Sequence, residues 1–265
     1  MARWALAALA LLAGAAPAWA AERMNPYPPP GMAENACPVS RDGLWAQDER
    51  VRASDWAWLC RYREDNARID PGNPPRVVFI GDSITENWVG LDPAVFGPGR
   101  LGRGISGQTS PQLLVRFWQD VVALKPRVVH IMVGTNDIAG NTGPTTPEAY
   151  KNAIRAMVDL AEANGIVVIL ASIPPADRFG WSQAIRPAPW IATLNTWLKS
   201  YAAERGAVYA DYHAVLTGPN GELRPEFGPD GVHPNAAGYA AMRPVAEAAI
   251  EQAEAIAAGR DAAQG

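Results

Sequence analysis

The 265-residue sequence has little of what marks several large classes of protein. It has 23 Lys and Arg against 27 Asp and Glu, with no basic run, and so lacks the electrostatic footprint of a nucleic-acid-binding protein. It contains no P-loop, HExxH or EF-hand pattern. What it does have is a hydrophobic share of 48%, which supports a sizeable core and argues against global disorder.

No apolar run is long enough to cross a membrane, which takes ~20 residues. A short basic start is followed by the uncharged apolar stretch 4–16 and by Ala18-Trp19-Ala20, an A-x-A cleavage signal. We therefore predict a signal peptide over residues 1–20, rather than a transmembrane anchor. The mature chain would start near Ala21 and be secreted or periplasmic.

Cysteine is scarce, since only Cys37 and Cys60 occur. An even pair in an exported protein predicts one disulfide, and the alternative is two buried thiols. With no histidine nearby, the pair lacks the ligands and spacing of a zinc site, so we expect no metal.

Proline marks the organisation of the chain. Residues 21–75 form a Pro-rich extension, in which Ser54 can cap one helix over about 55–68. Residues 76–258 form the main domain, and 259–265 a tail. Five buried parallel strands are predicted in the domain, near 77–80, 101–105, 127–133, 166–171 and 207–210; four of them rest on short apolar runs, and the pattern at 101–105 is weaker. Helices are expected over about 110–124, after a capping box of Thr145 and Glu148, over 189–204 and over 235–258, kinked or restarted at Pro244.

Polar groups follow these runs at the strand ends, where α/β sheets bind ligands. The first run ends in Gly81-Asp82-Ser83, and the third in Gly134-Thr135-Asn136-Asp137. A loop after the fifth carries Asp230-Gly231-Val232-His233-Pro234. Strands that alternate with helices form a parallel sheet, so these groups are expected to meet at one edge.

The residue types suit acyl transfer. Ser83 is the candidate nucleophile. It needs a general base to accept its proton, and His233 is the candidate for that role. Asp230, three residues earlier, can orient the imidazole. The candidate oxyanion donors are the N–H groups of Ser83 and Gly107 and the side-chain amide of Asn136.

Other readings of the same residues are weaker. His130 lies within an apolar strand and is interpreted as a core residue. His213, with Asp211 as its carboxylate partner, is the second candidate for the general base. The segment 102–107 matches G-x-G-x-x-G, but a poor strand precedes it and no acidic residue ends a second strand as a dinucleotide site requires. The G-x-S-x-G elbow of the α/β-hydrolases is absent.

Four blocks in this order resemble the SGNH hydrolases, also called GDSL-type lipases and esterases. They are Gly81 to Glu86, Arg103 to Thr109, Gly134 to Asp137 and Asp230 to Pro234. The second and third are most similar to the platelet-activating-factor acetylhydrolase catalytic-subunit branch and its bacterial relatives. The resemblance implies a flavodoxin-like three-layer sandwich with a five-stranded parallel sheet, order 2-1-3-4-5, and helices on both faces. It also implies a triad of Ser83, Asp230 and His233, the same three oxyanion donors, and no cofactor.

The sequence therefore predicts an exported serine esterase that cleaves short acyl, above all acetyl, esters of sugars or lipids. A thioesterase or lysophospholipase using the same site and a carbohydrate-binding module with a vestigial site are the alternatives. Asp82, Arg178, Phe179 and Trp181 are candidates for the substrate pocket. No pattern in the sequence predicts the acyl preference or the oligomeric state.

Overall fold

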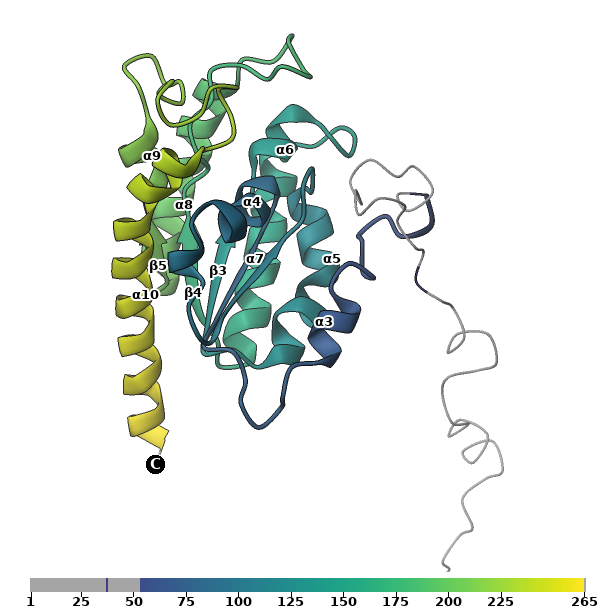
Figure 1. Ribbon diagram of the computed structural model, residues 1–265, viewed down its shortest axis with the longest axis vertical. Helices are drawn as coiled ribbons and strands as arrows, with labels where there is room; N and C mark the ends of the chain where they lie inside the picture. Colours follow the sequence, from purple (N-terminus) through teal and green to yellow (C-terminus); the bar gives the residue numbers. More distant parts are fainter. Residues whose placement is uncertain (1–36, 38–52, 265) are drawn as a thin grey trace, which may run out of the picture. The chain divides into compact units, whose positions relative to one another are not determined.

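The computed structural model describes residue 37 and residues 53–264 (Figure 1). The chain forms two compact units, Met1–Cys37 and Pro38–Gly265, and Cys37 is the described residue of the first. The predicted signal peptide, 1–20, lies outside the described residues. Among the helices that are described, none is long and apolar enough to span a membrane.

The second unit is built on a five-stranded sheet in which every neighbouring pair is parallel. Its strand order, β2-β1-β3-β4-β5, confirms the predicted topology. The strands are β1 Val77–Gly81, β2 Arg100–Gly104, β3 Val128–Met132, β4 Val167–Ala171 and β5 Val208–Ala210. Every residue of β1, β3 and β4 is buried, as expected for apolar runs covered on both faces.

Side chains of the strands alternate between two cores, one on each face of the sheet. In β1, Val77 and Phe79 pack with Trp88 of α4 (Ser83–Leu91) and with α10 (Ala236–Gln264). Val78 and Ile80 pack in the other core, with α5 (Ser110–Asp120), α7 (Pro147–Ala163) and α8 (Pro187–Arg205). The sheet thus lies between two layers of helices, which is the predicted three-layer sandwich (Figure 1).

Several helix boundaries differ from the predictions. The cap of α7 is Thr146, whose hydroxyl accepts the N–H of Ala149, rather than Thr145. The helix α5 ends at Asp120, and a short 3-10 turn, η4 (Val122–Leu124), follows it. The helix α10 continues through Pro244 to Gln264, so the expected tail is mostly helical. The remaining short elements are η3 Pro93–Val95, α6 Thr135–Ala139 and α9 Tyr212–Leu216.

The helix predicted over 55–68 is wrong for most of its length. Trp58 has a φ of 54°, in the left-handed region that a helix does not tolerate, and the regular helix α3 covers only Arg63–Ala67. The Asp55 carboxylate accepts the N–H groups of Leu59 and Cys60 at 2.8 Å and stabilises this turn instead. Cys60 and Cys37 are disulfide-bonded, which confirms that prediction.

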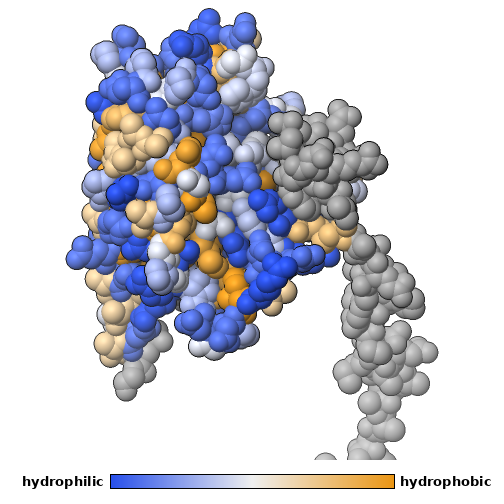
Figure 2. Space-filling model, in the orientation of Figure 1, coloured by the Kyte–Doolittle hydropathy of each residue, from blue (hydrophilic) through white to orange (hydrophobic). Residues whose placement is uncertain are grey.

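The surface drawn in Figure 2 is mostly hydrophilic, with apolar residues in separate patches. Large apolar side chains are exposed on several elements, among them Val89 on α4, Trp118 on α5 and Trp190 on α8. Such scattered exposure is ordinary for a folded domain. Trp181 differs from these residues because its ring packs beside His233.

Candidate functional site

The first strand positions Ser83 at the N-terminus of a helix. The strand β1 ends at Gly81, Asp82 is the N-cap of α4, and Ser83 is the first residue of that helix. The Asp82 carboxylate accepts the N–H of Ile84 at 3.0 Å, which fixes the turn between strand and helix. The Ser83 side chain is therefore held at the carboxyl edge of the sheet, next to the positive end of the helix dipole.

Ser83, His233 and Asp230 form a continuous hydrogen-bonded chain. Ser83 Oγ lies 3.0 Å from His233 Nε2, and His233 Nδ1 lies 2.7 Å from Asp230 Oδ2. The second carboxylate oxygen, Asp230 Oδ1, accepts the backbone N–H groups of Val232 at 2.9 Å and His233 at 2.8 Å. The backbone of the loop thus orients the Asp230 carboxylate, and the carboxylate orients the imidazole. In this arrangement the Ser83 hydroxyl can pass its proton to the ring.

The charge of Asp230 is favoured by these contacts. Partial burial by itself raises the pKa of this carboxyl, but the hydrogen bonds from the backbone and imidazole of His233 outweigh it. The pKa of Asp230 consequently lies below its ordinary value, so the group is ionised at neutral pH. An ionised carboxylate in this position stabilises the imidazolium that forms when the ring accepts a proton.

The backbone N–H groups of Ser83 and Gly107 have no acceptor among the described residues. Gly107 has a φ of 80°, in the region that favours glycine. The amide Nδ2 of Asn136 donates to the carbonyl of Gln108, the residue after Gly107, at 3.1 Å and to Oδ2 of Asp82, the residue before Ser83, at 3.3 Å. The residues next to Ser83 and Gly107 are thus joined through Asn136.

Asn141 was not singled out by the sequence analysis, although it contacts two residues that were. Its Nδ2 donates to Asn136 Oδ1 at 2.6 Å, which fixes the orientation of the Asn136 amide. Its Oδ1 accepts the indole N–H of Trp181 at 2.9 Å. The residue follows the left-handed Gly140 that ends α6, a turn that brings the two asparagines together. The Gly-Asn dipeptide at 140–141, which is typical of a turn, was the available signal.

The candidate pocket residues occupy different environments. Trp181 is 50% exposed, and its ring centroid lies 6.4 Å from that of His233. Phe179 is fully buried and stacks on Trp181 at 5.1 Å, so it supports that ring from behind. Arg178 is exposed, pairs with Asp177 at 3.3 Å and borders a cavity with Gly231 of the histidine loop. Asp82 is buried and contacts Asn136.

The other two histidines have structural partners. His130 is buried in β3, where Nε2 lies 2.8 Å from the Tyr212 hydroxyl, and burial lowers its pKa to about 3. His213 Nδ1 lies 3.0 Å from the Thr217 hydroxyl. Asp211 caps α9 by accepting the N–H of Ala214 at 3.1 Å, so the Asp211/His213 pair does not form the hydrogen-bonded arrangement that Asp230 and His233 do.

Two buried carboxyls at the site make stability depend on pH. Burial raises the pKa of Asp82 to about 7 and that of Asp137 to about 6, from an ordinary value of 3.8. A group with a raised folded-state pKa stabilises the fold below the unfolded pKa, and this contribution is lost as the pH rises through the folded pKa. We therefore expect the free energy of unfolding to fall as the pH rises from about 4 to about 7.

Asp82→Asn should flatten that decline, because it removes the larger of the two shifts. Urea unfolding at a series of pH values measures the slope, and Asp70→Asn, at an exposed carboxyl, is the control. A slope in Asp82→Asn equal to that of the wild type would contradict the assignment.

Among residues 37 and 53–264, no group of three or more His, Cys, Asp or Glu side chains is placed to hold a metal ion.

Known proteins are similar to this chain in sequence, in fold or in both. A GDSL-like lipase structure from Bacteroides thetaiotaomicron is 42% identical, with a TM-score of 0.72, over 75% of this chain and 100% of that chain. The acetylxylan esterase of Geobacillus stearothermophilus is 28% identical over 203 residues, 63% of this chain and 90% of that protein. A multidomain esterase of Ruminococcus flavefaciens is 29% identical over 120 residues, 44% of this chain but only 14% of that protein.

The family profile described as GDSL-like Lipase/Acylhydrolase matches residues 79–241, which include the last part of β1, Ser83 and the loop with Asp230 and His233. This match confirms the resemblance noted in the sequence. The chain thus belongs to the GDSL-like lipase/acylhydrolase (SGNH) family and is a carboxylic ester hydrolase of that type.

Proposed function

We propose that the protein hydrolyses esters through an acyl-enzyme on Ser83. Ser83 Oγ attacks the ester carbonyl carbon while His233 Nε2 takes its proton, and Asp230 stabilises the imidazolium. The tetrahedral intermediate collapses, and the leaving alcohol takes the proton from Nε2. Water then attacks the acyl group by the same route and releases the carboxylic acid. The observation that carries this proposal is the chain of 2.7 and 3.0 Å contacts from Asp230 to Ser83.

The negative charge on the carbonyl oxygen needs donors that are free to bind it. The N–H groups of Ser83 and Gly107, which have no acceptor in the described part of the chain, meet that need. The Asn136 amide is the third proposed donor. Its contact with Asp82, at 3.3 Å, is the longer and weaker of its two, so the N–H that now faces Asp82 is the one that the oxyanion would accept.

Asn136→Ala should lower kcat by about 10²–10³ and leave KM nearly unchanged, because this donor acts mainly in the tetrahedral state. Steady-state kinetics with p-nitrophenyl acetate measure both constants. Asp137→Ala is the matched neighbour: that carboxylate accepts the N–H and hydroxyl of Ser110 and so joins α6 to α5. We expect a milder kinetic effect from it. A near-wild-type kcat in folded Asn136→Ala would remove Asn136 from the oxyanion hole.

We propose that the substrates are short acyl esters, above all acetyl groups on xylo-oligosaccharide-type sugars. We also propose that the protein is exported. The support is of three kinds. The relative from Geobacillus stearothermophilus is an acetylxylan esterase. The exposed ring of Trp181 lies beside His233, where the alcohol part of a sugar ester could stack. The leader 1–20 has the pattern of a cleaved signal peptide.

Kinetics with a p-nitrophenyl ester series and with acetylated xylo-oligosaccharides test this proposal. Acetate should be the best acyl group. Trp181→Ala should raise KM for the oligosaccharide about 3- to 10-fold, as the loss of an aromatic contact of about 0.5–1.5 kcal/mol would. Trp181→Phe keeps the ring without the bond to Asn141, and should keep most of the sugar affinity.

Trp118→Ala is the control for this series, since Trp118 is similarly exposed but lies on α5. If long acyl chains are the best substrates, or if Trp118→Ala changes the sugar KM as much as Trp181→Ala, the sugar proposal fails. The esterase mechanism would remain.

A further inference from the structure

The loop that carries Gly107 is held by its neighbours on both sides. We refer to residues 105–109 as the donor loop. The Ser106 N–H donates to Glu86 Oε2 of α4 at 2.7 Å, and the Gln108 carbonyl accepts from Asn136. The position of the Gly107 N–H therefore depends on Glu86, which lies outside the proposed oxyanion hole, as well as on Asn136, which belongs to it.

The Gln108 side chain makes further hydrogen bonds inside the protein. It is fully buried, and both ends of its amide are bonded. Oε1 accepts Arg116 Nε at 2.6 Å, and Nε2 donates to the carbonyl of Ala57 at 2.9 Å. Such a doubly bonded amide leaves the donor loop little freedom to shift.

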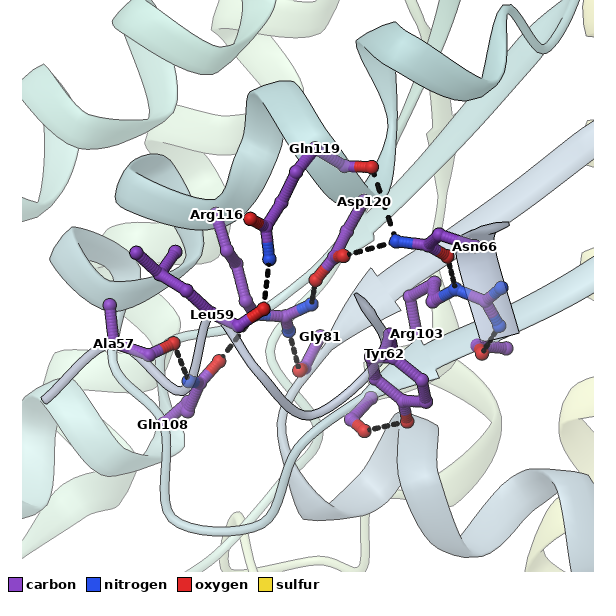
Figure 3. A network of polar contacts seen from close by, with 12 residues as sticks. Ala57, Leu59, Tyr62, Asn66, Gly81, Arg103, Gln108, Arg116, Gln119 and Asp120 are labelled. Atoms are coloured by element: carbon purple, nitrogen blue, oxygen red, sulfur yellow. Dashed lines mark hydrogen bonds and ion pairs between the residues drawn. The ribbon is translucent and has the colours of Figure 1, made fainter. Parts of the chain in front are cut away.

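Arg116 connects the donor loop to the strand that precedes the nucleophile (Figure 3). Its guanidinium is fully buried, and Nη2 donates to the carbonyl of Gly81, two residues before Ser83, at 3.0 Å. Nη1 lies 3.1 Å from the buried carboxylate of Asp120. A buried ion pair often adds no net stability, so a role in fixing one geometry is a reasonable use for it. The planar, five-donor fork suits that use.

The residues 55–66, which we refer to as the N-terminal segment, supply the outer partners of this network (Figure 3). Asn66 donates to Asp120 at 2.7 Å. Gln119 of α5 donates to the carbonyl of Leu59 at 2.6 Å, and Tyr62 donates to the carbonyl of Gly104 at the end of β2. The N-terminal segment therefore packs on the elements that flank the donor loop, although it precedes the matched family region.

We propose that Gln108 and Arg116, backed by the N-terminal segment, are positioning residues that set the Gly107 donor relative to Ser83. The proposal rests on the proposed oxyanion hole and extends it beyond the residues that touch the substrate. Arg116 contacts the two sides of that hole at once, through Gly81 and Gln108. A displacement of about 1 Å at a reacting centre can cost about 10²-fold in rate, so loss of this link lowers kcat.

The test compares two glutamines of α5 and its leading loop. Gln108→Met removes both hydrogen bonds of the side-chain amide and keeps a side chain of similar volume. Gln119→Met is the matched control, because it removes an amide-to-carbonyl bond to the same N-terminal segment but does not touch the donor loop. We expect kcat to fall about 10- to 100-fold in Gln108→Met with KM unchanged, and to stay within about 3-fold in Gln119→Met.

Arg116→Lys is the second variant, for the case in which Gln108→Met does not fold. Lysine keeps a charge opposite Asp120 but cannot contact Gly81, Gln108 and Asp120 together, so it should also lower kcat at constant KM. Wild-type kcat in either folded variant overturns the proposal, and so does an equal loss in Gln119→Met.

Hydrogen exchange of the peptide that spans 104–113 gives a readout without substrate. Exchange should be faster in Gln108→Met and Arg116→Lys and unchanged in Gln119→Met. Unchanged exchange in the first two overturns the positioning role. If Ser83→Ala or Asn136→Ala retains turnover while exchange responds as expected, the proposed function fails and the structural link stands.

Discussion

Ser83→Ala is expected to lose ester hydrolysis by about 10⁴-fold or more while the fold is retained. The physical reason is that the hydroxyl is the group that forms the acyl-enzyme, and neither His233 nor the oxyanion donors can replace it. The Ser83 side chain is largely buried at the N-terminus of α4, where alanine is well tolerated, so stability should change little. Turnover of p-nitrophenyl acetate and the thermal midpoint measure the two effects.

Ser172→Ala is the matched control for this experiment. Ser172 follows β4 as Ser83 follows β1, and its hydroxyl accepts the N–H of His213 at 2.8 Å. We expect this variant to keep activity within about 3-fold, since Ser172 has no base within the network described. Substantial turnover in Ser83→Ala would exclude the acyl-enzyme at this position.

His233→Ala should lose activity on a similar scale, about 10⁴-fold or more, because without a base the serine hydroxyl is a weak nucleophile at neutral pH. His213→Ala should keep most of the activity. In the structure the His213 imidazole contacts Thr217, and Asp211 caps a helix. Initial rates of both variants across a pH series, at equal concentrations of folded protein, are the measurement.

The pair of variants also decides between the two candidate bases. A large loss in His213→Ala together with activity in His233→Ala would transfer the role to the second pair. An equal, moderate loss in both would indicate that neither acts as the base.

The sheet and the hydrogen-bonded site could be predicted from the sequence because their signals are local and repeated. The runs at 77–80, 166–171 and 207–210 are short and uncharged, and each is followed within two residues by a polar residue, so strands and their carboxyl ends can be recognised together. Parallel strands then bring those ends to one edge, and this is why Ser83 and His233, far apart in sequence, were expected to meet. Asp230 and His233 are only three residues apart, so a single turn of the chain is enough to bring the carboxylate to the imidazole.

What could not be predicted depends on tertiary contacts. The segment near Trp58 has helical spacing, but Asp55 accepts two backbone N–H groups and favours a turn with a left-handed residue. Phe179 is as aromatic as Trp181 in the sequence, and only packing shows that one is buried behind the other. The link from Gln108 to Arg116 joins residues that carry no motif of their own.

The most direct test of the central claim is to identify the residue that a fluorophosphonate probe modifies. The probe reacts with an activated serine, and peptide mapping by mass spectrometry locates the adduct without any assumption about the natural ester. We predict a single adduct on Ser83, formed slowly in His233→Ala and absent in Ser83→Ala. An adduct on Ser106 or Ser110 in the wild-type protein, or labelling that persists in Ser83→Ala, would contradict the account.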